Sequence, residues 1–108
     1  MYWGRTSVAA QMYEIKLTPE AIEDLAAVRK FDQVRIVAGM EAQLKQEPAA
    51  ETRNRKRLRP NQLAEWALRI DNFRVFYDVL PAEAIVKVVA IGVKQGNELY
   101  IHGKKYEL

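Results

Sequence analysis

The sequence predicts an α+β fold. An N-terminal strand, a helical hairpin and a three-stranded antiparallel meander would form a curved four-stranded sheet with helices on one face. Three observations favour it: apolar spacing changes from period two to helical near residue 18, three β-rich runs of similar length follow in the second half, and no Gly/Ser-rich linker divides the chain. At 108 residues, the chain can build one hydrophobic core but not a cofactor domain plus a substrate domain.

We expect residues 12–108 to form a single domain and residues 1–11 to be a disordered extension. The extension has no apolar block of signal-peptide length, and Met12 is an alternative start. The longest apolar stretch, residues 85–93, is interrupted by Lys87 and is far shorter than the roughly 20 residues that span a membrane. We therefore expect no membrane contact. The absence of cysteine fits a reducing cytoplasm, where we expect the protein to act.

The first element is a strand over residues 13–17 (YEIKL), in which apolar and charged residues alternate. Thr18 is a favoured N-cap and Pro19 is favoured at the first helical position, so a helix should follow. Its apolar side is predicted to consist of Ile22, Leu25, Ala26 and Val28.

A second helix is predicted after Phe31, with Asp32 as its N-cap and its end before Pro48. Helical spacing predicts that its apolar side holds Val34, Val37, Met40 and Leu44. The two helices would form the helical hairpin.

The second half begins with a loop or irregular arm over residues 49–62. Asp71 and Asn72 tolerate positive φ and suit a tight hairpin turn between the first two β-rich runs. Residues 98–101 (ELYI) can add a short strand or an arm. The three β-rich runs are residues 64–70, 73–79 and 85–91, and the last alternates poorly, which predicts a central strand covered on both faces.

A turn at Asp71 and Asn72 fixes the register of the hairpin and sets Arg69 opposite Arg74. Two opposed arginines repel each other unless an anion or water lies between them, so the pair is a candidate phosphate clamp, although a solvated hairpin tip would look the same. The core face would hold Trp66, Leu68, Ile70, Phe73, Val75, Tyr77 and Val79. The other face would hold Glu65, Ala67, Arg69, Arg74, Phe76 and Asp78.

The charge is unevenly distributed along the chain. Residues 13–51 carry five basic and eight acidic side chains, whereas residues 52–108 carry eleven basic and six acidic ones. Such asymmetry favours a surface for a polyanion, most simply a nucleic acid, over a merely uneven solvated surface. Five cations lie within seven residues just before the hairpin, and we expect them to contact RNA phosphates: Arg53, Arg55, Lys56, Arg57 and Arg59.

The residue types restrict the chemistry. With one histidine, no cysteine and scattered carboxylates, no metal site is evident, so we expect no cofactor. RNA is then the favoured substrate for cleavage, because its own 2′-hydroxyl can attack the phosphate. Lys94, Tyr100 and His102 follow the break at Gly92, and a phenol or imidazole there can transfer protons, although each is more often an ordinary surface or strand residue.

Three stretches resemble the RelE/ParE superfamily of bacterial type II toxins: YEIKLTPEAIEDL, KRLRPNQLAEWALRIDNFRVFYDV and IVKVVAIGVKQGNELY. The resemblance covers nearly all of residues 12–100. It implies a helical hairpin on a curved antiparallel sheet and a cognate antitoxin that neutralises the toxin. RelE-like members cleave mRNA on the ribosome without a metal, whereas ParE-like members share the fold and inhibit DNA gyrase.

The resemblance also suggests site residues. Arg74 and Tyr100 match residues that RelE-like enzymes use, and Lys94 stands where they often carry arginine. The lysines of the first hairpin strand are replaced by Glu65 and Ala67, so Glu65 is a candidate base. We therefore expect a ribosome-associated mRNA endoribonuclease with Arg74, Lys94, Tyr100 and Glu65 as catalytic residues, and Arg69 with the five cations as RNA-binding residues. The alternatives are a gyrase inhibitor and a catalytically silent antitoxin-binding module.

Overall fold

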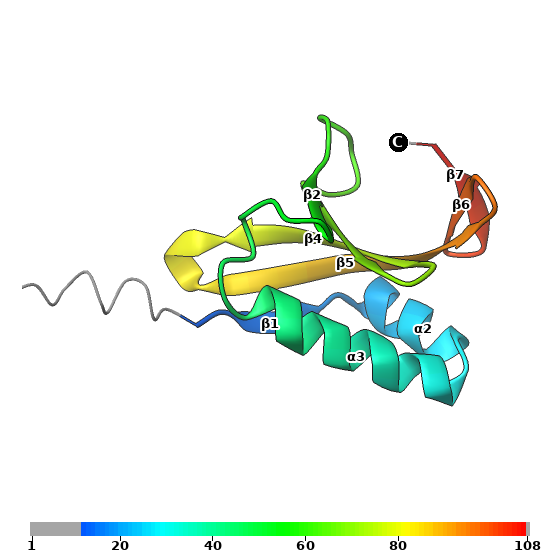
Figure 1. Cartoon of the computed structure of the whole chain (residues 1–108), viewed down its shortest axis with the longest axis horizontal. Helices are drawn as coiled ribbons and strands as arrows, with labels where there is room; N and C mark the ends of the chain where they lie inside the picture. Colours follow the sequence, from blue (N-terminus) through cyan, green and yellow to red (C-terminus); the bar gives the residue numbers. More distant parts are fainter. Residues whose placement is uncertain (1–11, 108) are drawn as a thin grey trace, which may run out of the picture.

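The structure is a computed structural model that describes residues 12–107 (Figure 1). The expected disordered extension, residues 1–11, lies outside the described residues. The elements in chain order are β1 (Glu14–Leu17), α2 (Pro19–Ala27), α3 (Lys30–Leu44), β2 (Arg55–Arg57), β3 (Trp66–Ile70), β4 (Phe73–Leu80), the 3-10 turn η1 (Pro81–Glu83), β5 (Ile85–Gln95), β6 (Glu98–Ile101) and β7 (Lys104–Tyr106). The α+β class and the helical hairpin are confirmed. Within the described residues, no helix has the length and apolar character that a membrane crossing needs.

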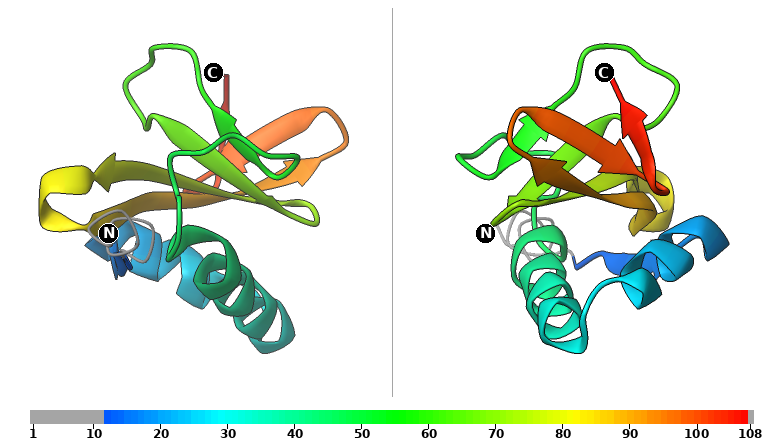
Figure 2. Two further views of the ribbon diagram at one scale, coloured as in Figure 1. Left: turned by 60° about the vertical axis from the view of Figure 1, so that its left-hand side comes forward. Right: turned by 90° about the vertical axis from the view of Figure 1, so that its right-hand side faces the viewer.

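The sheet has seven strands instead of the four expected. Neighbouring strands are antiparallel in the order β2-β3-β4-β5-β6-β7, and β1 pairs in parallel with the first half of β5. The additional strand β2 arises within the expected loop 49–62, because Arg55–Arg57 pair with Trp66–Leu68 along the edge of β3. Both helices cover one face of the sheet (Figures 1 and 2), which we call the helix side.

The start of α2 is as predicted, with Thr18 Oγ1 accepting a hydrogen bond of 3.2 Å from the Ala21 amide. The start of α3 is different, because Arg29 is the N-cap residue and Asp32 lies in the first turn, where it accepts a hydrogen bond of 3.3 Å from Arg29 Nε.

The predicted apolar side of α3 is half wrong. Met40 and Leu44 are buried together with Ile36, whereas Val34 is 63% exposed and Val37 is 38% exposed. The helix carries two apolar stripes, and only the stripe at i, i+4 and i+8 from Ile36 packs on the sheet. Helical spacing alone does not distinguish them.

The hairpin register is confirmed, with Arg69 opposite Arg74 and Ile70 opposite Phe73. The predicted core face lies on the helix side, where Trp66, Leu68, Phe73, Val75 and Tyr77 are buried, and Ile70 and Val79 pack against them. Burial is the main reason that the pKa of Tyr77 lies well above its usual range, and its hydroxyl donates a hydrogen bond of 2.8 Å to the Pro48 carbonyl.

Phe76 lies on the predicted face of the hairpin, opposite the core face, and it is 1% exposed. The loop between β2 and β3 folds over it, so a second, smaller core forms on the sheet face away from the helices. This core contains Ala64, Phe76, Ala90 and Ile101, with Leu58, Leu63, Ala67, Val89, Leu99 and Tyr106 packed against it. As expected, β5 is therefore covered on both faces.

A β-bulge in β5 determines how the strand meets α2. Phe76 pairs with Ala90 while Tyr77 pairs with Val88, so Val89 is an extra residue. The bulge reverses the alternation of the side chains, and Val88 before it and Ile91 after it both face the helices. Next to the bulge, the Val89 carbonyl and the Ile91 amide are bound by Thr18 and Asp24, the cap and a residue of α2.

Candidate functional site

Four basic side chains lie on the sheet face away from the helices, and we call them the cation face. Arg69 and Arg74 are opposite each other in β3 and β4. Gly92 pairs with Arg74, so Lys94, two residues further along β5, lies on the same face about 7 Å along the strand. Lys56 pairs with Ala67, which lies two residues before Arg69 in β3, so the side chain of Lys56 is on the same face of the sheet. The amide of Lys94 also donates a hydrogen bond of 2.7 Å to the Asn72 carbonyl, which holds the hairpin turn beside β5.

The cation face has unneutralised charge. Arg74 donates hydrogen bonds from Nη1 to the carbonyls of Asp71 and Phe73, at 3.0 and 2.9 Å. Partial burial, and secondarily the charge of Arg69, lower the pKa of Arg74. Among residues 12–107, none of the ion pairs includes Arg69, Arg74 or Lys94. An anion between the two arginines would relieve their repulsion, so the geometry suits a phosphate.

The five cations before the hairpin do not form one surface. Arg55 is 8% exposed, and its guanidinium donates to the backbone carbonyls of Gln43 and Ala50 at 2.7 and 2.9 Å, which ties β2 to the end of α3. Arg55 therefore holds β2 against α3, and its guanidinium is not available to an RNA phosphate, contrary to the prediction. Arg57 lies 5.8 Å from the centre of the Trp66 ring, on the helix side.

The remaining loop cations line two separate hollows. Arg53 and Arg69 share a groove of about 460 Å³ with Asn54, at the edge of the sheet beside α3. Arg59 lines a hollow of about 540 Å³ with Arg57 and Glu65. The groove beside α3 extends the cation face around the sheet edge, whereas the second hollow mixes both signs of charge.

Tyr100 and Glu65 lie apart from Arg69, Arg74 and Lys94. Tyr100 pairs with Val93, which packs on the helix-side core, so its ring lies on the opposite face of the sheet from Arg74 and Lys94. Glu65 lies four residues from Arg69 along the chain, about 13 Å in an extended strand. The structure thus brings Arg69, Arg74 and Lys94 together and places the two predicted proton-transfer residues apart from these three cations.

The Tyr100 hydroxyl has its own partner, donating a hydrogen bond of 2.9 Å to Glu98 Oε1. This bond to Glu98 raises the pKa of Tyr100. The other oxygen of Glu98 lies 3.1 Å from Lys105 Nζ, and hydrogen bonds from Lys105 and then Tyr100 lower the pKa of Glu98.

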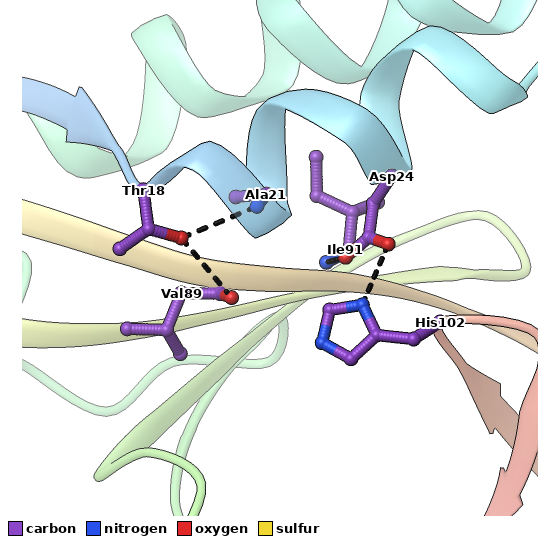
Figure 3. Close-up of polar contacts among 6 residues, drawn as sticks. All are labelled: Thr18, Ala21, Asp24, Val89, Ile91 and His102. Atoms are coloured by element: carbon purple, nitrogen blue, oxygen red, sulfur yellow. Dashed lines mark hydrogen bonds and ion pairs between the residues drawn. The ribbon is translucent and has the colours of Figure 1, made fainter.

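An aspartate–histidine pair on the helix side is the feature that sequence reasoning missed (Figure 3). Nδ1 of His102 lies 2.8 Å from Oδ1 of Asp24 in α2, whose side chain is 8% exposed. Oδ2 of Asp24 accepts a hydrogen bond of 3.0 Å from the amide of Ile91, just after the bulge, and Thr18 Oγ1 donates to the Val89 carbonyl at 3.4 Å. No sequence signal links two residues 78 positions apart.

This pair borders a hollow of about 550 Å³ between α2 and the ends of β5 and β6. Its walls include the apolar side chains of Val28, Phe73 and Val93, together with Tyr100 and His102. We call it the His102 hollow. Across residues 12–107, no three His, Cys, Asp or Glu side chains cluster as a metal site would require.

The helical hairpin also has an exposed apolar surface, which we call the helix patch: Ile22, Phe31, Val34 and Val37, exposed by 55, 65, 63 and 38%. A groove of about 420 Å³ runs between its two helices, lined by Leu25, Val34, Val37 and Glu41 among others. Contiguous exposed apolar side chains of this kind are typical of protein-binding surfaces.

Comparisons with known proteins agree with this fold. A solved chain in the crystal structure of the toxin–antitoxin complex RelBE2 from Mycobacterium tuberculosis is similar, with a TM-score of 0.69, 20% identity, and coverage of 79% of this chain and 94% of that one. No curated protein gives a significant match. A family model described as the ParE toxin of the type II toxin-antitoxin system parDE matches residues 15–97. The chain therefore belongs to the ParE toxin family, within the RelE/ParE superfamily of type II toxins.

Proposed function

We propose that this toxin inhibits translation by cleaving messenger RNA on the ribosome, without a metal ion. The observation that carries the proposal is the cation face, where Arg69, Arg74 and Lys94 lie on one side of the sheet without an acidic partner among the described residues. Such a surface suits a single-stranded backbone, because each phosphate is a charge that a guanidinium can bind through two hydrogen bonds.

The ribosome fits as the place of action. A surface of four cations contacts few phosphates, so the electrostatic affinity that it supplies for free RNA is low. A message already held in a larger particle supplies the binding energy that a small protein lacks. RNA also brings its own nucleophile, the 2′-hydroxyl, so the protein needs to bind the phosphate and move protons.

A second candidate is inhibition of DNA gyrase, which the resemblance implies for ParE-like proteins. Two observations favour it: the matching family model is that of the ParE toxin, and Tyr100 and Glu65 lie apart from Arg69, Arg74 and Lys94. A module that only binds an antitoxin would show neither activity.

The deciding experiment adds the purified chain to bacterial ribosomes programmed with a defined message, and maps new RNA ends by primer extension. The same preparation is added to purified gyrase in a supercoiling assay. We expect cleavage of the message and unchanged supercoiling. An intact message with inhibited supercoiling would reverse the ranking, and no effect in either assay would favour the silent module.

We also propose an antitoxin partner that covers the helix patch. The similar RelBE2 chain was solved in a toxin–antitoxin complex, and the helix patch is apolar and uncovered in this chain. An amphipathic antitoxin segment would bury Phe31, Val34 and Val37, and acidic residues elsewhere in the antitoxin would match the cation face.

A further inference from the structure

We propose that the His102 hollow is the proton-transfer centre of this toxin, with His102 as the general base, positioned by Asp24, for a 2′-hydroxyl of RNA. This inference rests on the proposed ribonuclease activity and assigns it a catalytic residue. It moves the chemistry to the helix side of the sheet and leaves the cation face as the surface that binds the backbone.

The first argument is the protonation state that Asp24 imposes. A carboxylate accepts hydrogen bonds and donates none, so the proton of a neutral His102 ring resides on Nδ1, which lies 2.8 Å from Oδ1. Nε2, on the far side of the ring, then carries the free lone pair (Figure 3). A base oriented by a carboxylate in this way is the arrangement that activates hydroxyl groups in other enzymes.

The second argument is how firmly the pair is held. The carboxylate of Asp24 is nearly buried and is bound at both oxygens, by His102 and by the amide of Ile91, which lies between the part of β5 that pairs with β1 and the part that pairs with β6. His102 is also fixed by the two-residue turn between β6 and β7, in which His102 and Gly103 have φ of 56° and 78°. The backbone of this turn therefore holds the ring beside Asp24.

The third argument is the space beside the pair. The hollow of about 550 Å³ lies within the range of roughly 300 to 1,000 Å³ typical of small-ligand sites. Its apolar wall of Val28, Phe73 and Val93 suits the face of a nucleobase, and the ring of Tyr100 offers a stacking surface. Glu98 accepts a hydrogen bond from the hydroxyl of Tyr100 and raises the pKa of that hydroxyl. Tyr100 therefore lines the hollow and does not act as the general acid.

The hollow and the cation face meet at the end of β5. Gln95 lines the hollow and directly follows Lys94, whose amide holds the hairpin turn at Asn72. An RNA strand bound at Arg74 and Lys94 therefore reaches the hollow by passing around this end of the sheet.

The reaction balances with these groups alone. Nε2 of His102 takes the proton of the 2′-hydroxyl, the 2′-oxygen bonds to the adjacent phosphorus, and the bond from phosphorus to the 5′-oxygen breaks. The leaving 5′-oxygen takes a proton from water, and His102 returns its proton to solvent. The products are a 2′,3′-cyclic phosphate and a 5′-hydroxyl.

The test compares His102→Asn and Asp24→Asn with the wild-type chain in single-turnover cleavage of message on programmed ribosomes. Asparagine tolerates positive φ, and its amide can donate to Asp24 as Nδ1 does, but it offers no base in place of Nε2. In Asp24→Asn the side-chain amide donates to Nδ1 of His102, so the ring proton moves to Nε2. Nε2 then has no free lone pair and cannot accept the proton of the 2′-hydroxyl. Lys104→Ala, in the neighbouring strand, is the matched control.

We expect both variants to lose about 10²-fold or more in the cleavage rate, because general bases contribute roughly 10²- to 10⁴-fold. Ribosome binding, measured by co-sedimentation, should be unchanged, and the control should cleave as the wild type does. Should either variant fail to fold, the other carries the test. If the wild type cleaves and both folded variants cleave within about threefold of its rate, the roles assigned to His102 and Asp24 are wrong and the proposed ribonuclease function stands. A wild-type chain that binds ribosomes and cleaves nothing would overturn both.

Discussion

Arg69 and Arg74 occupy directly opposed positions in β3 and β4, and no ion pair among residues 12–107 includes either of them. Like charges opposite each other destabilise a strand pair, so this arrangement costs stability in the free protein. A bound phosphate would turn the same arrangement into a favourable one. The relationship links the fold to the proposed function, because the register of one hairpin creates the anion site.

Replacing Arg74 by Ala should abolish growth inhibition while the fold persists. The guanidinium lies on the face away from the helices. Its removal relieves the repulsion with Arg69 and loses two hydrogen bonds to the turn carbonyls, so the melting temperature should change little. Arg74→Lys should keep part of the activity, because it retains the charge and loses the planar fork. Growth curves after induction, together with thermal melts, measure both effects. A folded Arg74→Ala toxin with full potency would exclude the assigned role.

Arg55 and Arg53 form a matched pair of arginines with opposite expected behaviour. Arg55→Ala should lower the free energy of unfolding by about 1 to 3 kcal/mol, since it leaves the partly buried carbonyls of Gln43 and Ala50 without this donor. Arg53→Ala, at an exposed position in a groove, should change stability by less than about 0.5 kcal/mol and weaken RNA binding. Chemical denaturation and RNA titration separate the two. Equal stability of the two variants would contradict the structural role of Arg55.

These residues also show what the sequence predicts and what it does not. The register at Arg69 and Arg74 follows from a local turn at Asp71 and Asn72, and it is confirmed. The burial of Arg55 depends on carbonyls supplied by α3, and the pairing of Asp24 with His102 depends on how α2 lies on a bulge in β5. Both are products of tertiary packing that no local pattern encodes.

The exposed valines of α3 also show what local periodicity cannot predict. Val34 and Val37 fit helical spacing as well as Ile36 does, but only the stripe containing Ile36 faces the sheet. Strand alternation places Phe76 on the face opposite the helices, and the loop between β2 and β3 covers it there. Local periodicity indicates which residues share a face, whereas the covering element decides whether that face is buried.

Val34→Asp should prevent neutralisation by the antitoxin and leave toxicity intact. The side chain is 63% exposed, so the free energy of unfolding should change by about 0.5 kcal/mol or less, while a charge in an apolar interface is costly. The measurement is rescue of growth when toxin and antitoxin are expressed together. Ile36→Ala is the contrasting variant, since it should lose about 2 to 5 kcal/mol of stability. Full rescue of the Val34→Asp toxin would place the antitoxin elsewhere.

The β6–β7 hairpin should loosen in acid. Hydrogen bonds from Lys105 and Tyr100 lower the pKa of Glu98, so the folded state favours the carboxylate more than the unfolded state does. The stabilisation is therefore present above the ordinary glutamate pKa of about 4.3 and is lost as pH falls through the lower folded value. The protection factors of the amides at Glu98, Tyr100 and Lys105, which correct exchange for its intrinsic rate at each pH, should fall between pH 6 and pH 3. Glu98→Gln should remove that loss of protection, and identical profiles for both proteins would refute the assignment.

The central claim is that the cation face binds an RNA backbone, and the most direct measurement is the salt dependence of binding to an uncleavable 2′-O-methyl RNA oligonucleotide. Each phosphate contact on a single strand contributes about 0.7 to the slope of log affinity against log salt. Arg69→Ala and Arg74→Ala together should make that slope shallower by about 1.4, whereas Lys16→Ala on β1 should leave it unchanged. A double variant with the wild-type affinity and slope would contradict the account.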